Sequence, residues 1–215
     1  IEELLGVKLD SEENVIIGAA MTFTNVETNP IILDKIPTLG RAVGNVGGPQ
    51  TRNVGTIGGN ICNGATSADS ASTLFAYNAF LIIEGKNGRR EVSIHDFYLE
   101  PGKVALEQGD ILVSIKVTKE NYEGFKGHYV KFSPRKAMDI ATLGCSILIK
   151  EENNIIKELR IAFGVAGPTP IRASEAEEFA KEKAINEENL DAIGDLCLKS
   201  SNARDSWRGS KAFRE

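Results

Sequence analysis

The residues most capable of chemistry lie in a glycine-rich stretch, 44–68, and just after it. The stretch holds seven glycines and few large apolar side chains. Its centre reads PQTRNVGTIGGN (49–60), and Asp69 follows nine residues later. Long ordered loops in compact domains are usually functional. The stretch is therefore the first place to look for a ligand site.

These residue types suit a nucleotide-type ligand. Gly58 and Gly59 have no Cβ, so a ligand can approach the backbone closely, and successive N–H groups can converge on phosphate oxygens. Thr56 and Asn60 add side-chain donors at the two ends of this segment. Asp69 would repel a pyrophosphate but would accept hydrogen bonds from ribityl or ribose hydroxyls. The combination predicts a ligand that carries both phosphates and polyols.

Two common nucleotide motifs are absent, and a ligand-free interpretation exists. There is no G-x-G-x-x-G after a strand and no G-x-x-x-x-G-K-[ST], which removes the Rossmann fingerprint and the P-loop. A glycine-rich turn between two helices would explain the same residues without any ligand. Residue types alone leave both interpretations open.

The elements around this stretch predict two lobes. A short apolar run at 14–19 favours a strand. Thr24 with Glu27 has the pattern of a capping box, and Pro30 suits the first turn of a longer helix. The apolar face of that helix consists of Ile32, Ile36, Leu39 and Val43. Asp69 opens another helix, and the glycine stretch is expected to be a loop.

Strand patterns dominate the middle of the chain. Asn87-Gly88 between two short alternating runs is a hairpin signal, and Asn153-Asn154 joins two later strands. The expected strands are 80–84, 90–94, 111–117, 129–132, 140–150 and 155–165, and the expected later helices are 174–183 and 187–199. Strands grouped together and then helices favour an α+β fold. We expect a lobe at 1–120 with a mixed sheet and the glycine loop at its edge. A second lobe at 121–215 should hold a small antiparallel sheet covered by the helices after Ser174.

Composition narrows the function classes. The chain of 215 residues has 25 Lys and Arg against 30 Asp and Glu, a net charge of -5 that argues against a nucleic-acid or membrane partner. No apolar run reaches the roughly 20 residues that a membrane span needs. The three cysteines form no C-x-x-C pair and the two histidines have no ligand spacing, so no metal site is expected. This cysteine usage indicates a reducing compartment, and we expect a cytoplasmic protein.

The segment 56–71, TIGGNICNGATSADSA, resembles the second FAD-binding segment of the molybdenum hydroxylase flavoproteins. That family includes xanthine, aldehyde, carbon monoxide and nicotinate dehydrogenases and 4-hydroxybenzoyl-CoA reductase. The likeness continues at 49–53, 102–103, 111–112, Lys131, Arg135, 137–141, 160–172 and 206–208. It covers essentially the whole chain, and 66–70 looks like the xanthine dehydrogenase branch, although many relatives carry a proline at position 66 or 67.

The resemblance implies a fold and a set of FAD contacts. The fold would be the second lobe of an FAD-binding type-2 (PCMH/VAO-like) domain, followed by a CO-dehydrogenase-flavoprotein-like C-terminal α+β domain. Asp69 would contact ribityl or ribose hydroxyls, Leu112 would meet the flavin ring region through its backbone, and Lys131 would reach the flavin. Ile57 would lie near the isoalloxazine and gate it. The implied cofactor-binding residues are Val46, Thr56, Ile57, Gly58, Gly59, Asn60, Asp69, Leu112 and Lys131, and no catalytic residue is implied.

The resemblance also implies a function. The chain would be the FAD-carrying electron-transfer subunit of a molybdenum hydroxylase, with xanthine or another purine as the expected substrate. Its partners would be a molybdopterin-binding large subunit and a 2Fe-2S small subunit, and FAD would pass electrons to NAD+. The alternatives are the flavin subunit of a CO, nicotinate, aldehyde or 4-hydroxybenzoyl-CoA enzyme, or a module that binds no flavin.

The ends of the chain add one expectation. It opens with IEELL and closes with KAFRE, and nothing before Ile17 resembles the first FAD segment of the family. We therefore expect a part of a longer polypeptide that binds FAD poorly by itself. A flavin subunit without its partners should also expose an apolar interface and self-associate.

Overall fold

The first and largest of three sheets contains five strands, and the smallest is the pair of β5 (Tyr98–Glu100) and β6 (Lys103–Val104). The computed structural model describes residues 1–215. The strands lie in the order β1 (Val7–Leu9), β2 (Val15–Gly18), β7 (Ile111–Val117), β3 (Phe80–Gly85) and β4 (Gly88–Ser93). Every neighbouring pair is antiparallel, so the expected mixed sheet is wrong. The helical connection from β2 to β3 does leave these two strands pointing the same way. However, β7 inserts between them and runs against both.

The connection from β2 to β3 is a chain of short helices. They are α1 (Phe23–Glu27), α2 (Pro30–Lys35), α3 (Pro37–Gly44), α4 (Pro49–Val54), α5 (Ile57–Cys62) and α6 (Asp69–Ala76), and a 3-10 turn, η1 (Glu2–Leu4), precedes β1. Thr22, rather than Thr24, caps α1 by accepting from the Asn25 N–H. The single long helix expected from Pro30 is divided at Pro37, which cannot donate a backbone hydrogen bond.

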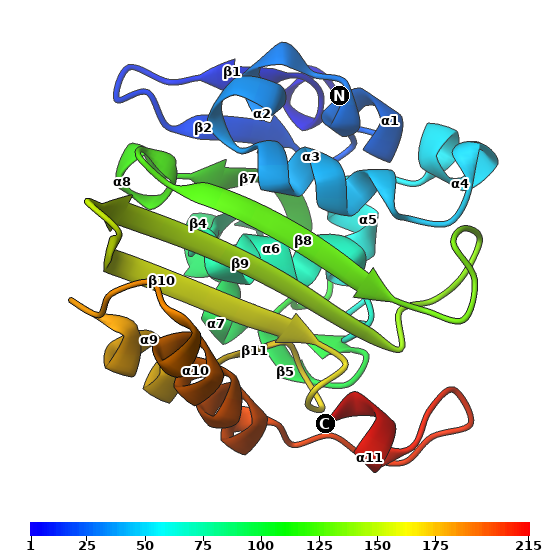
Figure 1. The fold of residues 1–215 in the computed structure, drawn as a ribbon. Coiled ribbons are helices and arrows are strands. Elements are labelled where there is room, and N and C mark those ends of the chain that lie inside the picture. Colours follow the sequence, from blue (N-terminus) through cyan, green and yellow to red (C-terminus); the bar gives the residue numbers. More distant parts are fainter.

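The second sheet contains four strands and is wholly antiparallel, as expected. Its order is β11 (Ile171–Arg172), β10 (Ile155–Gly164), β9 (Leu143–Glu152) and β8 (Lys126–Phe132). The turn between β9 and β10 places Asn153 and Asn154 at positive φ, which asparagine tolerates. The helices α9 (Ser174–Ala180) and α10 (Glu187–Ser200) pack on one side of this sheet, which confirms the expected cover (Figure 1). The remaining elements are α7 (Ile94–Phe97), β5 (Tyr98–Glu100), β6 (Lys103–Val104), α8 (Lys119–Tyr122) and α11 (Lys211–Arg214).

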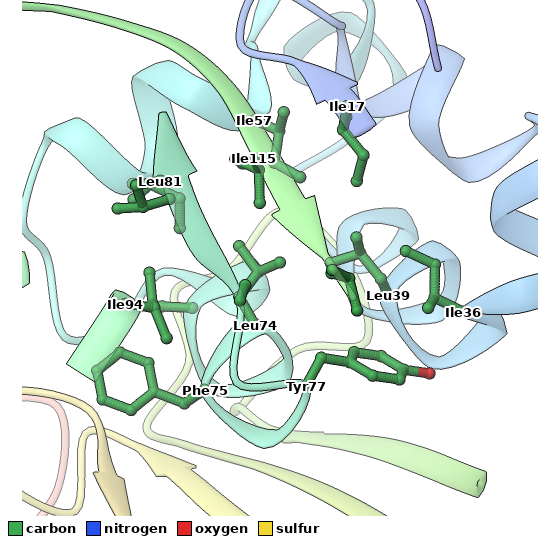
Figure 2. Packing of buried hydrophobic residues seen from close by; sticks show 14 of the residues in the cluster. Ile17, Ile36, Leu39, Ile57, Leu74, Phe75, Tyr77, Leu81, Ile94 and Ile115 are labelled. Atoms are coloured by element: carbon green, nitrogen blue, oxygen red, sulfur yellow. The ribbon is translucent and has the colours of Figure 1, made fainter. Parts of the chain in front are cut away.

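The helix α6 lies at the centre of the molecule. All eight of its residues are buried, and Figure 1 shows it behind the strands β8, β9 and β10. Leu74 and Phe75 of α6 pack with Leu81 of β3 and Ile115 of β7 in the main core (Figure 2). Polar groups face the other sheet, where the Thr73 and Ser146 hydroxyls share a hydrogen bond of 2.6 Å. The helix therefore joins the two larger sheets, and its first residue is Asp69.

No helix combines the length and the apolar character that crossing a membrane requires.

Candidate functional site

The glycine-rich stretch is more ordered than a loop. Its middle forms α4 and α5, because Thr56 caps α5 by accepting from the Gly59 N–H at 3.1 Å. The backbone of Thr56 also forms a bridge to Thr22 at the start of α1. The expectation of a long loop was wrong because the cap and the tertiary contacts outweigh the poor helix propensity of glycine.

The two adjacent glycines have different surroundings. Gly58 is buried, and its N–H donates to the Ala19 carbonyl at 2.9 Å. A Cβ on Gly58 would lie 2.6 Å from both the Cβ and the carbonyl oxygen of Ala19. Gly59 is exposed, and a Cβ there would meet only the Thr56 hydroxyl, at 3.0 Å. The expectation that both N–H groups turn toward a phosphate is therefore wrong, because the Gly58 N–H binds Ala19 and the Gly59 N–H binds the Thr56 hydroxyl. Packing requires a glycine at position 58. Gly59 is the one open to close approach from outside.

Two other predicted contact residues lie in the core. The Ile57 side chain is fully buried and packs with Ile17 and Ile115 (Figure 2). A side chain in that position cannot gate access to a ring, so this expectation is corrected. Leu112 is also buried, in β7. Its backbone pairs with Ile83, and its apolar side chain belongs to the same cluster as Ile57.

A cavity of about 350 Å³ brings three of the remaining predicted residues together, whereas Thr56, Gly59 and Lys131 do not line it. Val46, Asn60 and Asp69 line it, although they come from the turn after α3, from α5 and from the start of α6. The loop after β8 closes another side, where the Met138 N–H donates to the Gly47 carbonyl at 3.0 Å. The complete lining is Val46, Gly47, Thr51, Asn60, Asn63, Ala65, Ser67, Ala68, Asp69, Met138, Asp139 and Ile140.

Asp69 is the most constrained polar residue of this cavity. Its side chain is 7% exposed, and so is that of Lys131. The Tyr129 hydroxyl donates to Oδ1 of Asp69 at 2.6 Å, and Lys131 Nζ donates to Oδ2 at 2.9 Å. Lys131 Nζ also donates to the Asn45 carbonyl at 2.9 Å. Lys131 is thus not a solvated strand lysine, and each oxygen of the carboxylate already has a donor from β8.

Burial and the neighbouring positive charge shift the pKa of Asp69 in opposite directions. Burial raises the pKa of the Asp69 carboxyl above its usual value, and the ammonium of Lys131 and the hydroxyl of Tyr129 oppose that rise. Burial also raises the pKa of Tyr129, and the adjacent Asp69 carboxylate raises it further. Tyr129 therefore stays protonated and remains a hydrogen-bond donor. An ionised Asp69 is the form that both contacts stabilise.

The other polar groups of the cavity are uncharged, apart from Asp139. The Ser70 hydroxyl donates to Oδ1 of Asn60 at 2.7 Å, which holds that oxygen and leaves the amide nitrogen as a donor. Asn63, Thr51 and Ser67 add amide and hydroxyl groups. This set fits a ligand rich in hydroxyl and amide groups, such as the ribityl chain and ring edge of a flavin. It does not resemble a pyrophosphate cradle, which would need converging N–H groups or free cations.

The sequence interpretation did not assign Tyr129, Asn45 or Asn63 to the site. A tyrosine in an apolar strand pattern usually belongs to the core, and only the approach of β8 to the start of α6 reveals its partner. Asn45 contributes a backbone carbonyl, for which sequence carries no signal. Asn63 had a weak signal, because it lies three residues after Asn60 on the same helical turn. No group of three or more acidic, histidine and cysteine side chains could hold a metal ion.

A second hollow of about 370 Å³ lies on the other side of the loop after β8. It shares Met138, Asp139 and Ile140 with the first cavity, and its wall includes Trp207 and Arg208. Trp207 is 85% exposed, and the Arg208 guanidinium lies over its ring at 4.1 Å. Apolar surface is therefore exposed next to the candidate site.

Comparison with known proteins matches both parts of the chain. Residues 1–120 match the family model described as FAD binding domain in molybdopterin dehydrogenase, and residues 128–215 match the CO dehydrogenase flavoprotein C-terminal domain. The putative xanthine dehydrogenase FAD-binding subunit of Escherichia coli (strain K12) is 44% identical over 214 residues. These residues span 100% of this chain and 73% of that protein.

More distant relatives share the fold. The carbon monoxide dehydrogenase medium chain of Hydrogenophaga pseudoflava is 30% identical over 100% of this chain and 74% of that protein. A solved structure of carbon monoxide dehydrogenase from the same organism, lacking the Mo-pyranopterin moiety of the molybdenum cofactor, superimposes with a TM-score of 0.93. The superposition covers 100% of this chain and 74% of that one, at 30% identity.

Proposed function

The chain belongs to the flavoprotein subunits of the molybdenum hydroxylase family and is xanthine dehydrogenase-like. From this premise we propose that it carries electrons from iron–sulfur clusters, through FAD, to NAD+ in a purine-oxidising complex. Molybdopterin and 2Fe-2S clusters would be held by a large and a small partner subunit. A cytoplasmic location accords with this role.

One observation supports the proposed position of FAD. Val46, Asn60 and Asp69 line one cavity, and Lys131 contacts its wall through Asp69 and the Asn45 carbonyl. Four of the residues proposed to bind FAD are thus adjacent, although three come from the helical connection between β2 and β3 and one comes from β8 of the second sheet. We propose that this cavity takes the flavin and ribityl portion of FAD and that Gly59 and Thr56 approach its phosphates from outside.

FAD, when bound, supplies the redox chemistry that links one-electron carriers to a hydride acceptor. This chain would bind and orient it. The Lys131 ammonium would stabilise negative charge on the reduced flavin electrostatically, and Asn60 and Asn63 would bind polar groups of the cofactor. Ile57 and Leu112 would contribute only through their backbone, because their side chains fill the core.

Exposed apolar side chains support a role within a larger assembly. Phe132, Met138, Ile140 and Trp207 are all exposed, and all lie on or beside the loop after β8. Aromatic, methionine and arginine side chains are enriched where proteins bind one another. We propose that a partner subunit covers part of this surface.

The test uses the full-length chain purified with its partner subunits. The complex should show flavin absorption bands that bleach anaerobically when hypoxanthine or xanthine is added and return when NAD+ follows. A folded complex without flavin bands would contradict the flavin assignment. Recovery of the bands with ferredoxin or O2 but not with NAD+ would contradict the proposed acceptor, and bleaching by CO or nicotinate alone would contradict the purine substrate.

A further inference from the structure

Tyr129 connects the two parts of the chain at the candidate site. It belongs to β8 of the second sheet, whereas Asp69, which accepts its hydrogen bond, opens α6. The tyrosine side chain is buried, and its hydroxyl is the sole donor to Oδ1 of Asp69. The contact therefore holds one oxygen of a buried carboxylate whose other oxygen binds Lys131.

The position of the Lys131 ammonium depends on the two acceptors that it binds. Its ammonium has three N–H donors, and two of them bind Oδ2 of Asp69 and the Asn45 carbonyl. Asn45 directly precedes Val46 and Gly47, which line the cavity, and Asp69 lines it as well. These two acceptors thus hold the ammonium directly behind the cavity wall, which Lys131 itself does not line.

Loss of the Tyr129 hydroxyl would disturb this arrangement. Oδ1 of Asp69 would then be a buried anionic oxygen without a donor, which is unfavourable. The nearest cation is Lys131, so the carboxylate would turn to share both oxygens with it. The ammonium would move away from the Asn45 carbonyl and from the cavity wall.

We propose that Tyr129 is a positioning residue for the flavin site: by binding Oδ1 of Asp69, it holds the Lys131 ammonium against the cavity that takes the ring. This inference rests on the proposed flavin function. A residue of the second sheet would then influence the electrostatic environment of FAD, a cofactor that the first part of the chain would bind.

The chain offers a matched control. Tyr98 is buried like Tyr129, but its hydroxyl has no hydrogen-bond partner. Tyr98→Phe therefore removes the same atom from a similarly buried ring without breaking a contact. Tyr122→Phe removes a hydroxyl that donates to the Glu13 carbonyl, a contact outside the cavity lining.

The experiment compares Tyr129→Phe with both controls in the full-length chain and its complex. Tyr129→Phe should raise the FAD dissociation constant roughly 5- to 30-fold, the range for a lost contact of this kind. It should also make the flavin midpoint potential more negative, because the cation has withdrawn. In a Lys131→Met background, Tyr129→Phe should produce no further change in potential. The two control substitutions should leave the potential unchanged.

A second measurement needs no flavin. Reductive methylation of Lys131, followed by mass spectrometry, should be slower in Tyr129→Phe than in the wild type or Tyr98→Phe, because the ammonium has withdrawn from the cavity into a contact with both Asp69 oxygens. If Tyr129→Phe does not fold, the wild-type protein still allows a test. The hydroxyl proton of Tyr129 is buried in a hydrogen bond to Asp69, so NMR should show that it exchanges slowly with solvent.

Four results would overturn the proposal. They are an unchanged potential in folded Tyr129→Phe, an equal shift in the Lys131→Met background, unchanged methylation of Lys131, and rapid exchange of the Tyr129 hydroxyl. A wild-type complex that contains no flavin would instead refute the proposed function, so the two failures are distinguishable.

Discussion

Arg172 in β11 donates a hydrogen bond from Nη1 to the carbonyl of Phe75, 3.1 Å away, near the C-terminal end of α6. The same guanidinium binds both oxygens of Glu177, at 2.6 and 2.8 Å. A cation at a helix C-terminus complements the helix dipole and satisfies a terminal carbonyl. With Asp69 at the other end, α6 is held at both termini by side chains of the second sheet.

Replacing Arg172 should destabilise the fold. Arg172→Ala leaves the Glu177 carboxylate without its cation where the two side chains are only about one-seventh exposed, 15% and 14%. We expect the free energy of unfolding to fall by about 3 kcal/mol, the scale for breaking a largely buried pair. Denaturant-induced unfolding of the wild type and the variant measures this difference in the free energy of unfolding.

Arg89→Ala is the matched control, because Arg89 also contacts two carboxylates, those of Glu3 and Glu84, but is 51% exposed. That substitution should cost at most about 1 kcal/mol. Equal losses for the two variants would show that Arg172 does not stabilise α6.

The adjacent glycines should respond differently to a methyl group. Gly58→Ala places a Cβ 2.6 Å from the backbone and the Cβ of Ala19, which the β2 segment cannot easily relieve. It should cost about 1–3 kcal/mol, the range for overpacking. Gly59→Ala meets only a hydroxyl at 3.0 Å and gains helix propensity, so it should be nearly neutral. Chemical denaturation of both variants tests this, and a neutral Gly58→Ala would be inconsistent with the described packing.

The cysteines should react slowly at ordinary pH. Burial raises the pKa of Cys62 and of Cys197 to about 11 and that of Cys145 to about 12. Only the thiolate is nucleophilic, so at pH 8 Cys62 and Cys197 should react with iodoacetamide roughly 200-fold more slowly than a free cysteine, and Cys145 roughly 2,000-fold more slowly. The rates should rise tenfold per pH unit until the pKa is passed. Rapid alkylation of any one of them at pH 8 in the folded chain would contradict this environment.

Residue types and their spacing predicted most of the helices and strands. The Asn87-Gly88 and Asn153-Asn154 turns have the positive φ that their residue types permit, so both hairpins could be predicted. The apolar face of 30–43 is buried as the spacing indicated, although Pro37 divides it. The antiparallel first sheet could not be predicted, because the insertion of β7 between β2 and β3 depends on contacts far apart in the sequence.

The sequence identified several residues of the candidate site but did not show how they are oriented. Residue types identified Asp69 and Asn60 as polar groups that would contact a ligand, and the family resemblance added Val46 and Lys131. Neither source shows which side of a glycine faces the core. The opposite environments of Gly58 and Gly59, and the buried side chain of Ile57, appear only once α5 packs against Ala19. The hydrogen bond from Tyr129 likewise depends on the second sheet reaching α6.

We propose that this glycine segment and the cavity beside it hold FAD. The most direct measurement is the flavin content of Gly59→Val in the full-length chain, by absorbance after gel filtration. Its control is Gly194→Val, where an added Cβ meets nothing within 4 Å. Gly59 is exposed, so its side chain should leave the circular dichroism spectrum nearly unchanged and yet exclude a phosphate from the backbone. We predict that Gly59→Val loses its flavin while Gly194→Val keeps it; full flavin occupancy in Gly59→Val would contradict the account.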